Sequence, residues 1–229
     1  MIDKTQEQTI VTFVLDRSGS MSACKDATIE AFNAYVAGLK ADADGICFSL
    51  IQFDTVGIET TWKNAPIAVV AGLTHDTYQP RGGTPLIDAA YKTIKAVEKK
   101  VADYSAAPKI VICIQTDGEE NSSREHTWEA LTTLIKEKMA LGWQFNFMGA
   151  GIDAYLQSQR MGLSAEHTMS YDHNDRDATR AAFAASAENA QSFRRGRAKS
   201  TGYSAMQKLA AKDRFDRSQA PPPSHDVEL

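Results

Sequence analysis

Short runs of β-branched and aromatic residues alternate along this chain with stretches in which apolar residues recur every three or four positions. A short apolar run bounded by turn residues predicts a strand buried on both faces, and the longer spacing predicts an amphipathic helix. Strands are expected at 10–15, 46–53, 110–114, 145–148 and 167–171. Strands that alternate with helices predict an α/β fold: a doubly wound, mainly parallel sheet with right-handed connections and helices on both faces.

The segments between the strands carry the helical pattern. One helix is expected between Ser22, a candidate cap, and Gly45, and its apolar face is formed by Ile29, Phe32, Val36 and Leu39. Further helices are expected at 85–101, 125–141 and 175–193, the last capped by the acidic segment 172–177. The segment 58–62 follows a turn at 54–57, which predicts a hairpin and therefore one antiparallel edge strand.

Length and charge indicate how the chain is divided. Its 229 residues, 43% of them hydrophobic, are enough for one sizeable domain, which we place at residues 1–193. Residues 194–217 hold eight basic and two acidic residues, a net charge of +6, whereas residues 1–193 carry −8. Apolar periodicity weakens after residue 193, and three prolines at 221–223 exclude regular structure there. Residues 194–229 are therefore predicted to form a basic, flexible C-terminal tail.

Hydroxyl and carboxylate side chains directly follow the first and third buried strands. A further hydroxyl lies at the start of the helix expected at 85–101. Asp16, Ser18 and Ser20 come directly after the first strand, Thr84 opens the helix, and Asp117 follows the third strand. Ligands of doubly wound sheets bind outside the carboxyl ends of the strands, where the winding direction switches. We therefore expect these five side chains to converge at one edge of the sheet.

An all-oxygen set of this kind suits a hard divalent cation. Mg²⁺ is favoured, and Mn²⁺ or Ca²⁺ is possible. Two carboxylates placed close together repel each other unless a cation or a proton lies between them. Neutral hydroxyls are weak ligands, so the cation stays electron-poor. The pattern therefore predicts a metal site with an open position for the carboxylate of a protein partner.

Three segments resemble the metal-ion-dependent adhesion site of von Willebrand factor type A domains. They are Val14-Leu15-Asp16-Arg17-Ser18-Gly19-Ser20-Met21, Gly83-Thr84-Pro85 and Thr116-Asp117-Gly118, in the family's order, and the resemblance covers residues 8–193. It implies that both serines touch the metal directly, and that the threonine and the two aspartates do so directly or through water. It also implies a non-enzymatic protein-binding module. Small bacterial and phage-borne members act inside assemblies, which favours an intracellular or phage assembly here.

Four charged residues lie beside these ligands in the sequence. Arg17 and Arg81 are candidates for clamping an incoming carboxylate, and Glu119 and Glu120 for repelling an acidic ligand or occupying the open metal position. Solvated surface charges are the plain alternative for all four. The five histidines show no metal-ligand spacing and are interpreted as structural or exposed.

Three other functions stay open. The basic tail is a candidate for binding nucleic acid or an acidic protein, with strong salt dependence. The acidic end at 226–229 is a candidate for reaching the metal of a second copy and driving self-association. A Mg²⁺-dependent hydrolase with Asp16 as nucleophile is a third possibility, although Ser18 stands where such phosphatases need a second aspartate. No residue offers an evident general acid or base.

Cysteine usage and the N-terminus bear on location. Cys24, Cys47 and Cys113 are odd in number, without paired spacing, and two of them lie in apolar runs, which favours a reducing compartment. There is no apolar signal region and no apolar stretch of about 20 residues that could span a bilayer. A cytoplasmic protein without membrane contact is therefore expected.

Overall fold

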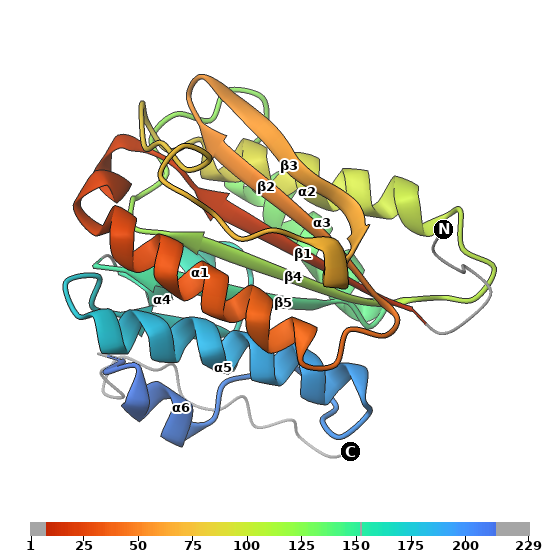
Figure 1. Cartoon of the computed structure of the whole chain (residues 1–229). Coiled ribbons are helices and arrows are strands. Elements are labelled where there is room, and N and C mark those ends of the chain that lie inside the picture. The colour runs from red at the N-terminus through yellow and green to blue at the C-terminus, as the bar shows by residue number, and fades with distance from the viewer. Residues whose placement is uncertain (1–7, 152, 214–229) are drawn as a thin grey trace, which may run out of the picture.

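The computed structural model describes residues 8–151 and 153–213, and it contains a six-stranded sheet in the order β3-β2-β1-β4-β5-β6 (Figure 1). The strands are β1 Thr9–Asp16, β2 Ile46–Asp54, β3 Gly57–Pro66, β4 Lys109–Thr116, β5 Gln144–Ala150 and β6 Thr168–Tyr171. All neighbouring pairs are parallel except β2 and β3, which form an antiparallel hairpin. The predicted doubly wound sheet with one antiparallel edge strand is therefore confirmed.

β1 is a central strand and is buried on both faces, as its unbroken apolar run predicts. Val11, Phe13 and Leu15 contribute to one core together with the helices α1 (Lys25–Lys40) and α5 (Arg176–Arg194). Ile10 and Val14 belong to the core on the opposite face, where they pack with α2 (Leu86–Val101) and α3 (Trp128–Ala140). Figure 1 shows α1 and α5 on the near side of the sheet and α2 and α3 behind it.

Several helix boundaries differ from those expected from the sequence. Ser22 lies in a short 3-10 helix, η1 (Gly19–Cys24), that precedes α1. α3 begins at Trp128 rather than at 125, because the side chain of Thr127 caps it by accepting a hydrogen bond from the amide of Ala130 at 3.2 Å. Asp175 caps α5 as predicted, accepting from the amides of residues 177 and 178. Three short helices were not predicted: η2 (Ile67–Val69), η3 (Ala165–His167) and α4 (Ala154–Arg160).

The segment predicted to be a flexible tail is packed against the domain as far as residue 213. Its first residue, Arg194, ends α5 and pairs with Asp42. Thr201 and Tyr203 are buried, and Tyr203 belongs to the same core as α1 and α5. A sixth helix, α6 (Ala205–Ala210), follows, with Ser204 and Gln207 forming a capping box. Flexibility is therefore the wrong prediction for 194–213, and residues 214–229 lie outside the described residues.

No helix in the described part of the chain is long and apolar enough to cross a membrane.

Candidate functional site

The sequence-predicted ligands lie at the carboxyl ends of β1 and β4, which are neighbours at the centre of the sheet. The chain runs from β1 to β2 on one side, whereas β4 lies on the other side of β1, so the winding direction switches between these two strands. Asp16 is the last residue of β1, and Asp117 directly follows β4. This is the position at which doubly wound sheets bind ligands.

Four of the five predicted ligands are joined by hydrogen bonds. The amide of Ser18 donates to Oδ1 of Asp16 at 2.7 Å, which turns the loop back onto the strand end. The hydroxyls of Ser18 and Ser20 lie 3.1 Å apart, and Ser20 donates to Oδ1 of Asp117 at 2.6 Å. The loop after β1 thus brings its three polar side chains to the loop after β4.

Thr84 reaches the same group from the start of α2. A Cβ built on Gly118 would lie 2.8 Å from Oγ1 of Thr84 and 3.5 Å from Oγ of Ser20, so both hydroxyls face the backbone of this glycine. Any larger residue at 118 would collide with Thr84. The glycine in Thr-Asp-Gly is therefore required by the close approach of three loops.

Asp16 is a buried carboxylate without a cationic partner. Its exposed fraction is 0%, and no lysine, arginine or histidine in the described residues forms an ion pair with it. Burial raises the pKa of Asp16 to about 7, although hydrogen bonds from Thr116 and Ser18 act in the opposite direction. Burial also raises the pKa of Asp117, opposed by its hydrogen bond from Ser20. The two carboxylates therefore lie together. His173 is a basic side chain close enough to Asp117 for its charge to oppose the rise in that pKa, whereas Asp16 has no ion-paired basic partner among the described residues.

The site offers a hard cation a mixed set of oxygen donors rather than a cluster of acids. The described residues contain no group of three or more His, Cys, Asp or Glu placed to hold a metal. The five predicted ligands supply two carboxylates and three hydroxyls, and these donors fit a hard divalent cation in their chemistry. Asp16, Ser18 and Thr84 are buried, whereas Ser20 is exposed, so the cluster opens to solvent on one side.

Arg17 and Arg81 do not lie free at the rim of the site. The guanidinium of Arg17 is buried and contacts Asp54 at 2.8 Å and Glu59 at 2.8 Å. Arg81 contacts the same two carboxylates, at 2.9 and 3.2 Å. Arg17 is thus committed to internal ion pairs, which corrects its expected role as a clamp for a partner's carboxylate. Arg81 is 42% exposed, and its role toward a partner stays a prediction.

The two glutamates after Asp117 have different surroundings. Glu120 accepts hydrogen bonds from the amide of Ile87 at 2.8 Å and from the amides of Ser122 and Ser123 at 2.8 and 2.7 Å. It therefore holds the loop after β4 against the first turn of α2, and its expected role as a gate to the metal gives way to this internal one. Glu119 is exposed, and its effect on ligand access stays a prediction.

Several residues that support the site were not identified from the sequence. Thr116 donates to Oδ2 of Asp16 at 2.5 Å, and Tyr78 donates from its hydroxyl to the carbonyl of Asp16 at 2.7 Å. Asn121 accepts from the amide of Thr84 at 2.9 Å, and Gln157 of α4 donates to the carbonyl of Gly118 at 3.3 Å. Of these residues, only Thr116 could have been identified from the sequence, because it directly precedes the predicted ligand Asp117. Tyr78 and Gln157 come from parts of the chain that are distant in sequence, and Asn121, although it lies in the same loop as Asp117, acts through Thr84.

Asp88, in the first turn of α2, fixes the next part of the loop after β4. Its carboxylate accepts from the amides of Arg124, Glu125 and His126 and lies 3.0 Å from Nδ1 of His126. Burial alone would raise the pKa of Asp88, but these hydrogen bonds outweigh it and lower the pKa below its usual value. Because the folded-state pKa is lowered, the ionised carboxylate stabilises the fold above about pH 4, and this stabilisation is lost as the pH falls through the folded-state pKa.

Asp88→Asn therefore tests this support. We expect the substitution to lower the free energy of unfolding by about 2 kcal/mol at pH 7, because hydrogen bonds to a charged group are replaced by weaker ones. The difference from the unsubstituted protein should begin to shrink below about pH 4 and should disappear below the lowered folded-state pKa, where Asp88 becomes neutral in the folded protein as well. Urea unfolding at several pH values measures both effects. A difference that is the same at neutral pH and well below the folded-state pKa would contradict the ionic role of Asp88.

Comparison with known proteins identifies the fold. No protein-family model matches this chain, and no curated protein matches it in sequence. Among solved structures, the pilus adhesin SpaC from Lactobacillus rhamnosus GG aligns with a TM-score of 0.61 and 15% identity, over 81% of this chain and 30% of SpaC. A von Willebrand factor type A protein from Catenulispora acidiphila aligns with a TM-score of 0.57 and 15% identity, over 81% and 43% of the two chains. This is a von Willebrand factor type A-like fold.

Other structures with this type A-like fold include one of similar size. The vWF domain of the type V pili tip protein Mfa5 from Porphyromonas gingivalis aligns with a TM-score of 0.57 and 12% identity, over 84% of this chain and 97% of that domain. The manganese-loaded TRAP protein of Plasmodium vivax aligns with a TM-score of 0.55 and 16% identity, over 73% and 70%. This chain spans less than half the length of SpaC and of the Catenulispora protein.

Proposed function

We propose that this chain is a non-enzymatic binding module that holds a divalent cation at Asp16, Ser18, Ser20, Thr84 and Asp117 and engages a protein partner's carboxylate through it. The observation that carries the proposal is the buried carboxylate of Asp16, which has no cationic partner among the described residues and is linked through the two serines to Asp117. Burying an uncompensated carboxylate is costly, and a cation removes that cost.

The choice of cation follows from the ligands. Five oxygen donors favour Mg²⁺, with Mn²⁺ or Ca²⁺ as alternatives. When bound, the cation supplies a positive charge with an open position for one further oxygen ligand. The exposed side of the cluster, at Ser20, is where a partner's carboxylate would approach. A manganese-loaded protein among those with a similar fold supports the cation, and the pilus adhesin and the pili tip protein support a role in binding.

The cellular setting belongs to the same proposal. Three buried, unpaired cysteines favour a reducing compartment, and we place the protein in the cytoplasm, within a larger intracellular or phage assembly. Nucleic-acid or acidic-protein binding through the basic segment is less favoured, since Arg194 and Arg195 are paired with Asp42. Self-association through 226–229 concerns residues outside the described part of the chain. A Mg²⁺-dependent hydrolase is the remaining alternative, and nothing favours it beyond the position of Asp16.

Calorimetric titration with Mg²⁺ and Mn²⁺ tests the cation. We expect Asp117→Ala and Ser20→Ala to weaken binding by more than about tenfold, because each removes a ligand or its support. Both side chains lie near the surface of the cluster, so these variants are expected to fold. Asp76→Ala, an exposed aspartate in the loop before the site, is the matched control and should leave the affinity unchanged. Equal affinities in all four proteins would contradict the metal site.

A pull-down tests the partner. Immobilised protein is compared with its Asp117→Ala variant, each with Mg²⁺ and after removal of divalent cations. Partners that require both the cation and Asp117 are ligands of the site, and their acidic residues are then replaced one at a time. A set of partners that is insensitive to Asp117 and to the cation would contradict the proposed function even if the cation binds.

A further inference from the structure

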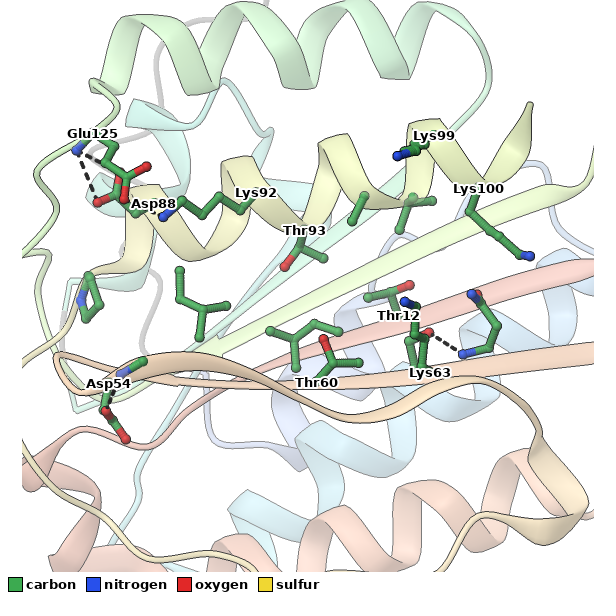
Figure 2. Close-up of a pocket in the computed structure, with 18 of the residues that line it drawn as sticks. Thr12, Asp54, Thr60, Lys63, Asp88, Lys92, Thr93, Lys99, Lys100 and Glu125 are labelled. Atoms are coloured by element: carbon green, nitrogen blue, oxygen red, sulfur yellow. Dashed lines mark hydrogen bonds and ion pairs between the residues drawn. The ribbon is translucent and has the colours of Figure 1, made fainter. Parts of the chain in front are cut away.

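A cavity of about 900 Å³ lies between α2 and the β2–β3 hairpin, apart from the predicted metal ligands (Figure 2). Residues of α2 form one wall, residues of β2 and β3 form the other, and Thr12 of β1 lies at the base. None of the five predicted metal ligands lines it. Its volume is within the range of about 300–1,000 Å³ that is typical of small-molecule sites. The cavity is therefore large enough for a ligand of its own.

Charges are distributed unevenly along this cavity. At the end near the hairpin turn lie Asp54, Asp88 and Glu125 (Figure 2), and each is already engaged. Asp54 binds the two arginines described above, and Asp88 accepts from the loop after β4. Glu125 pairs with Lys92 at 2.5 Å. Each acidic side chain at this end is thus already bound by groups of the protein itself.

The other end of the cavity carries three lysines and one aspartate, Asp103, among its lining residues. Lys63 lines it from β3, and Lys99 and Lys100 line it from the last turn of α2 (Figure 2). Lys100 pairs with Asp103 at 3.4 Å, whereas Lys63 and Lys99 form no ion pair with any described residue. Uncompensated lysines on two facing walls concentrate positive potential between them, and lysine is a common ligand of phosphate groups.

Between the two ends lie hydroxyls that lack a partner. Thr12 is 0% exposed and Thr93 is 4% exposed, and the Oγ1 atom of each has no hydrogen-bond partner within the described residues. Figure 2 shows Thr93 on the α2 wall and Thr60 on the β3 wall, and Thr12 of β1 also lines the cavity. A buried hydroxyl without a partner is costly, so a ligand that supplies polar groups here removes a penalty.

We propose that this cavity binds a small phosphorylated polyol, with its phosphate at Lys63 and Lys99 and its hydroxyls at Thr12 and Thr93. The apolar side chains of Ile51, Ile58 and Val97 line the same cavity and cover the carbon skeleton. A protein or nucleic-acid ligand is disfavoured because the unpartnered hydroxyls are buried at the base of the cavity. This site is independent of the cation and of the partner proposed above.

Calorimetry with the full chain, freed of divalent cations on a chelating resin, tests the site with two probes: inorganic phosphate and ribose 5-phosphate. We expect ribose 5-phosphate to bind more than about tenfold more tightly, since it reaches the hydroxyls as well as the lysines. The double variant Lys63→Ala/Lys99→Ala should weaken both probes by about tenfold or more. Lys95→Ala, on α2 but outside the cavity, should change neither by more than about twofold.

Thr93→Val tests the contribution of the Thr93 hydroxyl separately from that of the lysines that bind the phosphate. It keeps the shape of the side chain, so we expect the affinity for inorganic phosphate to stay the same and the advantage of ribose 5-phosphate to fall to less than about threefold. Failure of both probes to bind at millimolar concentration would overturn the proposal. Equal weakening by Lys95→Ala and by the double variant would also overturn it, since it would show attraction by the whole surface. Equal binding of the two probes to the unsubstituted protein would overturn the assignment of the hydroxyls.

Discussion

Replacing Asp54 with alanine is expected to destabilise the fold by about 3–5 kcal/mol, the range found when one partner of a buried ion pair is removed. The side chain of Asp54 is 0% exposed and lies between Arg17 and Arg81. Its other oxygen accepts from the amides of Val56 at 2.6 Å and Gly57 at 3.0 Å, which closes the turn of the hairpin. The substitution leaves the guanidinium of Arg17 buried and without its main partner. Urea unfolding followed by circular dichroism measures the loss.

Glu59→Ala is the matched control for this prediction. Glu59 binds the same two arginines, but its side chain is 53% exposed, so we expect a loss of less than about 1 kcal/mol. A second test combines Arg17→Met with Asp54→Ala. This double variant removes both the buried guanidinium and the carboxylate that pairs with it. It should therefore regain much of the stability that Asp54→Ala alone loses. The single Arg17→Met variant completes the comparison. A double variant that loses as much stability as the two single variants together would contradict the buried ion pair as the cause.

The ion pairs of Arg17 and Arg81 show which part of the site could be predicted from the sequence. Asp16, Ser18, Ser20, Thr84 and Asp117 follow or precede regular elements whose periods are local properties of the chain, so their convergence follows from the sheet topology. The partners of Arg17 lie 37 and 42 residues further on, in the hairpin. No local pattern indicates that a residue beside a ligand turns inward, and the sequence therefore suggested a surface clamp.

The helix boundaries differ for a related reason. The pattern of apolar residues extended the third long helix to residue 125, but the amides of residues 124–126 bind the carboxylate of Asp88 instead. The hydrogen bonds between Asp88 of α2 and these amides thus take the place of the first turn that was expected for α3. α4 is only seven residues long, and such a short element carries too few apolar repeats to be predicted. The ends of the strands were predicted more closely, except for β3, whose polar second half continues to Pro66.

Replacing Tyr203 with alanine gives the second large effect, and it tests whether residues 194–213 belong to the domain. We expect a loss of about 3–5 kcal/mol, comparable to other truncations of large buried aromatic side chains. Tyr203 is 4% exposed, and its hydroxyl lies 2.7 Å from Oγ of Ser186 on α5. Its amide donates to the carbonyl of Glu166 at 2.8 Å, and the carbonyl of the nearby Thr201 accepts from the side chain of Asn146 on β5 at 2.8 Å.

These contacts tie the segment after α5 to both the sheet and the core, because Tyr203 packs in the cluster that also contains Phe13 and Phe183. Truncating the ring leaves a cavity there that the surrounding helices can only partly fill. Thermal and urea unfolding of the full chain measure the loss.

Two further variants separate the causes. Tyr203→Phe keeps the ring and removes only the hydroxyl, so we expect a loss of about 1 kcal/mol, since Ser186 also donates to the carbonyl of Ala182 at 3.2 Å. Met206→Ala, on α6 with a 73% exposed side chain, should change stability by less than about 0.5 kcal/mol. If Tyr203→Ala were as harmless as Met206→Ala, the segment would be detached in solution and the domain would end near α5. A large loss confined to Tyr203 places the C-terminal boundary of the domain beyond Tyr203, and the positive charges between α5 and this residue then belong to the surface of the domain itself.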